Sequence, residues 1–429
     1  MPGRLRRAFL WCGAAFLLAT VLLPVQASPL LPEEAVRRAV QVDPRLKRAR
    51  ALTEAAEAYS RGAGAQPNPV LQISGVAGDT REDANSLTQP LEIAGQPRLR
   101  REIADKTALA NSAFEKAVRQ EVALEAAKAY YNYWQAVEFM RLSKSQLELA
   151  GKLLDIASQR LRLGEISESE LFRARLLHTQ TELALVEAEE GLLLSQQSLN
   201  LLLSNENGVP ELPSFTGDVP MAPPFPLETS SGDFSQLEQQ ISERPELKES
   251  LSKASVAKLE ADLAGRAGAP DLRFTAYRSS LGHGAVQGLQ VSVVIPLFDW
   301  GRLGAAHARQ KKLAEARVHE ISIVRRELQN ELQTALTKYK VAAKKREALI
   351  DQVSRQVELV QLAQRGYEIG LISLFEVIDA QDANLRARQA FIDAEADYQR
   401  ARVQLWWAAG LPLSPENSDE DAKKGIFIP

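Results

Sequence analysis

Cysteine is almost absent from this chain: Cys12 is the single cysteine among 429 residues. A lone cysteine excludes disulfides, cysteine-based zinc sites and iron–sulfur clusters within the chain. The four histidines are scattered along the sequence, so no histidine metal site is expected. The net charge is only −3 and no nucleic-acid-binding signature is recognisable, so nucleic acid is not an expected partner.

Aromatic residues are also scarce, and glycine and proline are not enriched. Aromatics make up 6% of the chain, which has 24 glycines and 21 prolines. Alanine, leucine, glutamate, glutamine and arginine dominate instead, a composition typical of long helices rather than of the three compact domains that the length alone suggests. No nucleophile with a base, metal cluster or phosphate-binding loop is recognisable, so we expect neither an enzyme nor a bound cofactor.

The N-terminus has the pattern of a secretory signal. Arginines precede an apolar run at 8–23, and a small-residue cleavage pattern ends at Ala27. We expect cleavage after Ala27, which removes residues 1–27 and with them Cys12. The apolar run is short for a membrane-spanning helix, and no later segment contains the roughly 18 consecutive apolar residues that such a helix needs. The mature chain is therefore expected to be exported and to contain no transmembrane helix.

The second half of the sequence repeats the first. At an offset of about 200 positions, prolines, glycines and charged residues of the two halves coincide. The matches include Gly95 with Gly301, Glu125 with Glu331, Tyr133 with Tyr339, Gly164 with Gly370, Ser167 with Ser373 and Glu170 with Glu376. We therefore expect a first structural repeat at 28–204, a proline-rich linker at 205–233, a second repeat at 234–413 and a polar tail at 414–429.

Each repeat is expected to contain the same parts in the same order. A short helix and a second helix precede two alternating segments, a very long helix and a final helix; the expected helices are 33–42, 44–61, 97–163 and 167–203, then 234–243, 245–266, 302–369 and 373–409. At about 1.5 Å per residue, a helix of roughly 70 residues is a rod of roughly 100 Å. No globular core needs such a rod.

Small residues recur every seven positions along the final helix of the first repeat, as in a coiled-coil seam. The series is Ala174, Thr181, Ala188, Ser195 and Leu202. Seams of small residues let helices approach closely, which favours a packed wall of helices. A soluble coiled-coil scaffold and a four-helix bundle remain open at this point.

The turns between the long and final helices have matching sequences. Each turn has a glycine where a helix would end, then a serine followed three residues later by a glutamate, which predicts a helix-ending glycine and a capping box. These residues are Gly164, Ser167 and Glu170 in the first repeat and Gly370, Ser373 and Glu376 in the second. We expect the two hairpin tips to be built alike.

Four segments alternate between apolar and polar residues. The clearest runs through Leu289, Val291, Val293, Ile295 and Leu297, and the others contain Leu71 and Ile73, Leu87 to Ile93, and Leu272 to Ala276. In an exported chain, such segments of about 9 to 11 residues are typical of transmembrane barrel strands. Ordinary hairpins half-buried on the helices are the alternative.

Four strands are too few to close a barrel. Open sheet edges in lipid leave backbone groups without partners, so several chains must each contribute four strands. Two chains give eight strands with a filled interior, and three give twelve with room for a channel. Oligomerisation is therefore expected from the strands alone.

Taken together, these features resemble the TolC-type outer membrane efflux proteins. The resemblance covers nearly the whole mature chain and includes PLFDWGR at 296–302 and GLISLFEVIDA at 370–380. It implies a mainly α fold with a membrane β-barrel, in which a homotrimer forms a 12-stranded barrel in outer membrane lipid and a periplasmic α-barrel of coiled-coil helices. It implies two further partners, a periplasmic adaptor and an inner-membrane transporter, commonly proton-driven.

The same resemblance implies roles for the tip residues. Glu376 and Asp379 match acidic positions that form rings at the periplasmic entrance, and Asp382 lies one turn further along. Capping alone is the other reading of Glu376. The residues implied to dock the adaptor are Gly164, Glu165, Ile166 and Ser167 at one tip and Gly370, Leu371, Ile372 and Ser373 at the other.

The segment 89–98 resembles the heavy-metal-efflux branch of this family more than its other branches. The expected function is therefore the outer membrane channel of a tripartite efflux system, with heavy-metal cations as the cargo. A periplasmic coiled-coil adaptor or scaffold, and a type I protein-secretion channel, are the alternatives.

Overall fold

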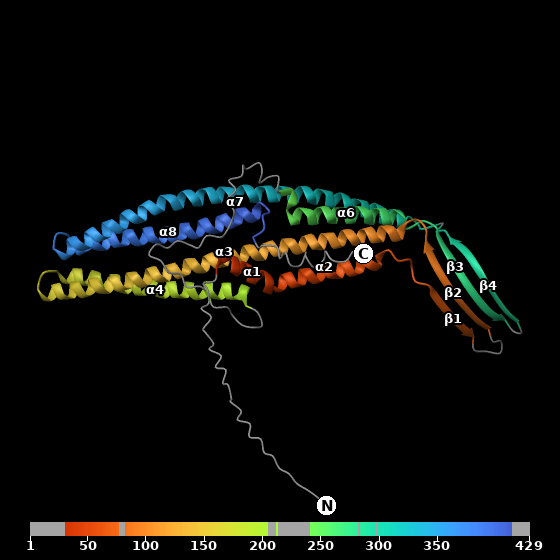
Figure 1. Cartoon of the computed structure of the whole chain (residues 1–429), viewed down its shortest axis with the longest axis horizontal. Helices are drawn as coiled ribbons and strands as arrows, with labels where there is room; N and C mark the ends of the chain where they lie inside the picture. Colours follow the sequence, from red (N-terminus) through yellow and green to blue (C-terminus); the bar gives the residue numbers. More distant parts are fainter. Residues whose placement is uncertain are drawn as a thin grey trace, which may run out of the picture.

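The computed structural model describes residues 31–76, 82–204, 212, 241–281, 284–296 and 298–413. The expected signal peptide, the C-terminal tail, Leu297 and all of the proline-rich linker except residue 212 lie outside these ranges. The described chain is an elongated helical bundle with a curved four-stranded sheet at one end (Figure 1).

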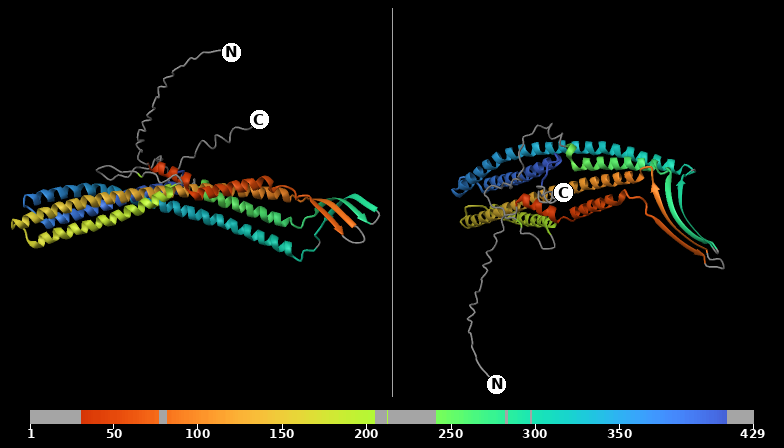
Figure 2. Two further views of the ribbon diagram at one scale, coloured as in Figure 1. Left: turned by 90° about the horizontal axis from the view of Figure 1, so that it is seen from below. Right: turned by 45° about the vertical axis from the view of Figure 1, so that its right-hand side comes forward.

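Two helices of 67 residues run along the molecule, α3 (Gln96–Arg162) and α7 (Arg302–Glu368). On the half farther from the sheet they are accompanied by α4 (Glu168–Leu203) and α8 (Leu374–Ala408), and on the half nearer the sheet by α2 (Pro44–Ala63) and α6 (Pro245–Gly265). The short helix α1 (Pro32–Val42) packs on the middle of α3. Figure 2 shows that the helices form a layer rather than a globule.

The described strands form one antiparallel sheet in the order β1-β2-β3-β4. Their bounds are Val70–Val76, Glu82–Glu92, Asp271–Leu281 and Gly284–Val294. β2 of the first half pairs with β3 of the second, with Leu87 opposite Ala276. The sheet thereby joins the two halves of the chain, and β1 and β4 are its edges.

The turn from β4 into α7 is built by three consecutive residues of the PLFDWGR motif. The Asp299 carboxylate accepts hydrogen bonds from the backbone N–H of Gly301 at 3.2 Å and of Leu303 at 2.7 Å. Trp300 and Gly301 both have positive φ, 54° and 82°. Gly301 tolerates this left-handed conformation and Asp299 accepts hydrogen bonds from N–H groups at the helix start, so α7 can begin at Arg302, immediately after this turn.

Buried residues concentrate in the middle of the bundle, where α1, α3, α4 and α8 meet. Tyr130, Tyr131 and Trp134 of α3 are at most 1% exposed there and pack with Val36 of α1 and Ala396 of α8. The aromatic cluster of α3 is therefore part of the core. This core holds α3 and α8 side by side. It thereby sets the direction in which the α3–α4 and α7–α8 hairpins extend from the middle of the bundle.

Two expected elements differ from the sequence prediction. Of the helix expected at 234–243, the described part is a single 3-10 turn, η1 (Ile241–Glu243). The last strand ends at Val294 and begins at Gly284, earlier than the alternating pattern indicates. Pro296 has no N–H to donate to a strand ladder, while Gly284 and Gly288 hide the alternation at the start of the strand.

Candidate functional site at the two ends of the helical layer

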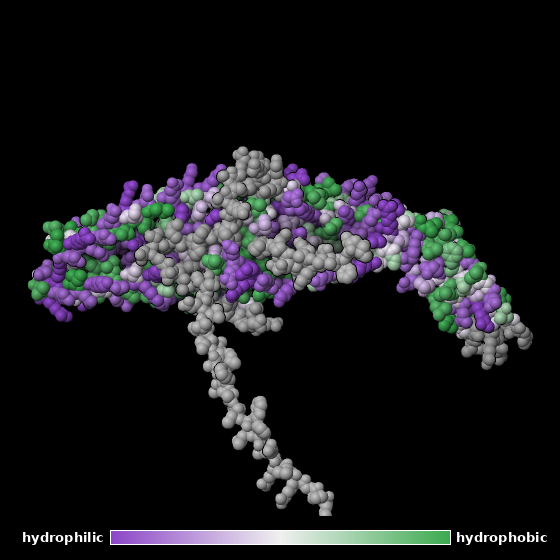
Figure 3. Space-filling model, viewed as in Figure 1, coloured by the Kyte–Doolittle hydropathy of each residue, from purple (hydrophilic) through white to green (hydrophobic). Residues whose placement is uncertain are grey.

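One face of the sheet is an apolar surface open to its surroundings. Leu289, Val291 and Val293 of β4 are 87%, 62% and 56% exposed. Directly paired residues lie on the same face of an antiparallel sheet, so the register places Phe274 beside Val291. We call the apolar side chains of this face the apolar band; they are Leu71, Leu87, Leu91, Leu272, Phe274, Ala276, Leu289, Val291 and Val293. Gln89 lies on the same face, opposite Phe274. It is part of the hydrophobic surface at the sheet end in Figure 3.

The opposite face of the sheet is polar. Thr88 lies opposite Thr275, and their hydroxyl oxygens are 3.1 Å apart in a hydrogen bond. Gln290 and Ser292 of β4 share this face with Arg273 of β3. The alternation expected from the sequence therefore separates an apolar face from a polar one, which is the arrangement of a barrel strand with lipid outside and water inside.

At the other end of the layer, both hairpins reverse direction at a glycine. Gly164 and Gly370 have φ of 74° and 79°, the left-handed conformation that glycine adopts freely. In each turn the N–H groups of the glycine and of the next residue donate hydrogen bonds to carbonyls of the preceding helix, as in a Schellman motif. The second of these bonds runs from Glu165 to Arg160 at 2.9 Å in one turn and from Leu371 to Gly366 at 2.8 Å in the other. The helix-ending glycines expected from the sequence are confirmed.

The structure brings the two tips together in one small core. Leu153 and Ala157 of α3 pack with Tyr367 of α7 and with Leu374 and Val377 of α8. The eight residues expected to dock an adaptor lie around this core. Ile166 and Ile372 are partly buried against it, whereas Leu371 is 76% exposed.

Arg160 joins the two hairpins. Its guanidinium donates hydrogen bonds to the carbonyls of Tyr367 and Glu368, at 3.1 and 3.3 Å, and lies 4.3 Å from the centroid of the Tyr367 ring. The sequence pattern does not single out either side chain, because an arginine near a helix C-terminus and a tyrosine on an apolar stripe are both ordinary features.

Glu376 is exposed and belongs to a complete capping box at the start of α8. Its Oε2 accepts a hydrogen bond from the Ser373 backbone N–H at 2.9 Å, and its own N–H donates to the Ser373 hydroxyl at 3.4 Å. The carboxylate therefore stabilises the first turn of α8 while remaining in contact with solvent.

Asp379 and Asp382 continue the acidic side of the same helix. Asp379 is exposed, and Asp382 is partly buried. Burial raises the pKa of the Asp382 carboxyl, Arg386 opposes that rise, and the negative charge of Asp379 adds to it. The interaction places these two carboxyls within electrostatic reach of one another, as expected for residues one turn apart.

The sequence predicts a capping box at each tip, but the first tip does not form one. Within the described chain, the side chain of Ser167 caps no backbone N–H; its hydroxyl is hydrogen-bonded to that of Ser169 at 2.8 Å. Ser169 has no counterpart at the second tip, where Phe375 occupies the equivalent position. The competing hydroxyl explains why two similar sequences form different caps.

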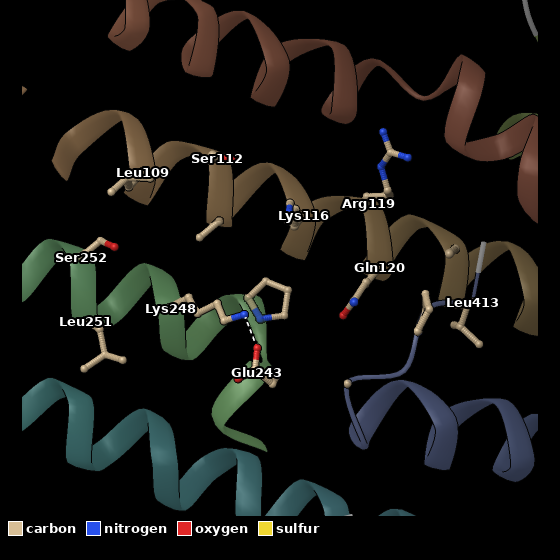
Figure 4. A pocket seen from close by; sticks show the side chains of 15 residues that line it. Leu109, Ser112, Lys116, Arg119, Gln120, Glu243, Lys248, Leu251, Ser252 and Leu413 are labelled. Carbon is tan, nitrogen blue, oxygen red and sulfur yellow. Dashed lines mark hydrogen bonds and ion pairs between the residues drawn. The ribbon is translucent and has the colours of Figure 1, made fainter. Parts of the chain in front are cut away.

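A cleft of about 600 Å³ lies between α3 and α6 beside the end of the described chain (Figure 4). Lys116 and Arg119 of α3, Lys248 of α6 and Leu413 contribute to its lining, and Lys248 is paired with Glu243. None of the described residues that line this cleft is expected to form the gate or the docking tips.

Among the described residues, no helix has both the length and the hydropathy of a membrane span. The same part of the chain contains no group of three or more histidine, cysteine, aspartate or glutamate side chains arranged to hold a metal ion.

Comparison with known proteins agrees with this geometry. The chain is 23% identical over 384 residues to the cobalt-zinc-cadmium resistance protein CzcC of Cupriavidus metallidurans, covering 87% of this chain and 89% of that protein. It is 23% identical over 356 residues to the cation efflux system protein CusC of Escherichia coli, covering 79% and 75%. It is 25% identical over 336 residues to the outer membrane protein OprJ of Pseudomonas aeruginosa, covering 75% and 67%.

Solved structures share the fold. A crystal structure of CusC superposes with a TM-score of 0.77 at 20% identity, covering 90% of this chain and 93% of CusC. The CmeC outer membrane channel of Campylobacter jejuni superposes with a TM-score of 0.74 at 18% identity, covering 99% and 97%. The model of the family described as outer membrane efflux protein matches residues 35–205 and 237–411. The chain is thus an outer membrane transport protein and not an enzyme, and it belongs to the outer membrane efflux protein family.

Proposed function

We propose that three copies of this chain form the exit duct of a tripartite efflux system. The observation that carries the proposal is the four-stranded sheet, which has an apolar band on one face and two edges that pair with nothing in the described chain. Such a sheet is stable in lipid only when its edges are paired by other chains. Three copies supply twelve strands, enough to enclose a channel rather than a filled interior.

The length of the helices supports a duct that crosses the periplasm. Each 67-residue helix spans about 100 Å and carries the sheet at one end and a hairpin tip at the other. With the sheet in the outer membrane, the tips point toward the inner membrane. There they dock a periplasmic adaptor that links the duct to an inner-membrane transporter, driven by protons.

Exposed apolar residues on α4 support assembly of the helical part. Leu176, Leu183, Leu194 and Leu201 are each at least 51% exposed along one helix. A row of exposed leucines on a single helix favours contact with another helix. In the proposed trimer, α4 packs against the neighbouring copy and completes the periplasmic wall.

The acidic side of α8 supports a gate at the narrow end of the duct. Glu376 and Asp379 lie one turn apart near the tip, so three copies bring six carboxylates around one axis. Such a ring attracts cations, and the repulsion among its charges makes the opening of the ring sensitive to protonation and to bound cations. Glu376 then caps its helix and lines the entrance at the same time.

Heavy-metal cations are the proposed cargo. Two relatives over most of the chain are named for cobalt-zinc-cadmium resistance and for cation efflux, and an acidic entrance suits positively charged cargo. A type I protein-secretion channel is the alternative. The chain parts proposed with this function are a signal peptide at 1–27, repeats at 28–204 and 234–413 joined by the linker at 205–233, and a polar tail at 414–429.

The proposed function is tested by deleting the gene for this chain and then supplying the chain again from a plasmid. Deletion should increase cobalt, zinc or cadmium accumulation, and the full chain should restore efflux. A variant with Gly370→Pro, which forbids the left-handed turn at the second tip, should reach the outer membrane but fail to restore efflux. Unchanged metal accumulation after deletion would reject the cargo, and full rescue by Gly370→Pro would reject the role of the tip.

A further inference from the structure

A second cleft, of about 540 Å³, lies in the middle of the molecule between α3, α7 and α8. We call it the lysine cleft. Four cationic side chains and one carboxylate contribute to its lining; these are Lys128, Lys338, Lys345, Arg400 and Asp397. The remainder of the lining is small or uncharged. The cleft therefore concentrates positive charge in a chain whose net charge is slightly negative.

Lys128 is the most enclosed of the three lysines. Burial lowers the pKa of its ammonium group, and the positive charge of Lys338 across the cleft lowers it further. Glu125 and Glu331 act in the opposite direction and offset part of this effect, but each also has an arginine partner outside the cleft. Glu125 is paired with Arg45 at 2.5 Å, and Glu331 with Arg244 at 3.4 Å. Within the described chain, neither acid forms an ion pair with Lys128 itself.

Asp397, the carboxylate that lines the cleft, is already paired with Arg400. Arg400 donates hydrogen bonds to Asp397 at 2.8 Å, to the Gln135 side-chain oxygen at 2.7 Å and to the Asn132 side-chain oxygen at 2.6 Å. These three bonds hold the guanidinium in one place between α3 and α8. Arg400 is thus pre-organised, and Asp397 leaves the three lysines uncompensated.

Lys338 and Lys345 stand two turns apart on the same side of α7, about 10 Å along its axis. Among the described residues, neither has a hydrogen-bonding or ion-pair partner. Lysines on an exposed helix face are normally solvated and need no ligand. Here the two face a partly buried third lysine across a cleft, and like charges held together in this way favour a bound anion.

We propose that the lysine cleft binds a small polyanion with two or more charged oxygen-bearing groups, such as a diphosphate or a polycarboxylate. One group lies between Lys128 and Lys338, and another reaches Lys345. The anion restores the charge balance that the protein side chains leave incomplete, and it accepts hydrogen bonds from ammonium groups that have no hydrogen-bonding partner in the described part of the chain.

The test uses the full mature protein purified in detergent, with pyrophosphate as the probe and calorimetry at fixed ionic strength. Saturable binding is expected, and the double substitution K338Q and K345Q should weaken it at least tenfold. K344Q is the matched control, because Lys344 is exposed on the same helix and does not line the cleft. Absence of saturable binding, or equal binding by the double variant, would overturn the proposal.

A second measurement needs no variant. Acetylation of lysines by a water-soluble reagent is followed by mass spectrometry with and without pyrophosphate. Lys338 and Lys345 should be protected severalfold while Lys344 is not. If Lys338, Lys344 and Lys345 are protected equally, or if none of them is protected, pyrophosphate does not occupy the cleft. Either result overturns the proposal, even if the double variant fails to fold.

Discussion

Arg160 and Tyr367 bind the two hairpins to one another: the guanidinium of Arg160 lies 4.3 Å from the centre of the Tyr367 ring and donates a hydrogen bond to the Tyr367 carbonyl at 3.1 Å. Arg160 belongs to the first half of the chain and Tyr367 to the second. Together with the tip core, this contact closes the two hairpins against each other beside the acidic turn of α8.

The first prediction concerns this link. Arg160→Ala removes a cation–π contact of roughly 0.5–2 kcal/mol and the hydrogen bonds to α7. The tips should separate more readily, so single-channel conductance in planar bilayers should rise. Arg162→Ala is the matched control, since Arg162 is exposed two residues away on the same helix. Equal conductance of the two variants would mean that the link does not restrain the entrance.

The second prediction separates the two roles of Glu376. Glu376→Ala with Asp379→Ala removes the proposed carboxylate ring and should raise conductance while reducing preference for cations. Ser373→Ala removes the capping hydroxyl at a cost of about 1 kcal/mol but keeps both charges, so ion selectivity should stay unchanged. Unchanged conductance and selectivity of the double variant would leave Glu376 only its capping role.

The third prediction follows from Asp382. Burial and the charge of Asp379 raise its pKa, so the folded protein holds the proton of this carboxyl more tightly than the unfolded chain does. Ionised Asp382 therefore destabilises the fold at neutral pH, and the penalty shrinks as the pH falls through the raised pKa and is gone below the ordinary pKa of the unfolded chain. Asp382→Asn should raise the melting temperature at pH 7 and have a smaller effect in acid. A lower melting temperature at pH 7 would contradict the sign.

The fourth prediction tests the two faces of the sheet. Val291→Lys places a charge on the apolar band, where lipid contact costs roughly 2–4 kcal/mol near the membrane midplane. Gln290→Lys places the same charge on the polar face, one residue away. The first variant should be depleted from outer membranes after carbonate extraction, and the second should be retained. Equal retention would show that the apolar band does not face lipid.

Local signals in the sequence predict most of the helical layer. The boundaries of α2, α3, α7 and α8 lie within about two residues of their expected positions, because Pro44, Gly95, Gly301 and Gly370 interrupt the helical pattern there. Alternation likewise predicts strands at the correct segments. These features depend on residues close to one another in the chain.

Features that depend on distant residues could not be predicted in the same way. The pairing of β2 with β3, the contact of Arg160 with Tyr367 and the lysine cleft each bring the two halves of the chain together. Nothing in the local pattern of Lys128 or Lys338 distinguishes it from a solvated lysine. The hydroxyl of Ser169 shows the same limit at short range, since it diverts Ser167 from the cap that the sequence motif predicts.

Disulfide trapping of neighbouring sheets tests the trimeric duct most directly. The chain beyond the expected cleavage site contains no cysteine, so Gln72→Cys on β1 can be combined with one cysteine on β4, at Gln290, Ser292 or Val294 in turn. If the edges of neighbouring copies pair to close one barrel, at least one combination should yield a covalent species of three chains on a denaturing gel, and each single variant should yield none. Only monomers, or ladders without a closed three-chain limit, would contradict the account.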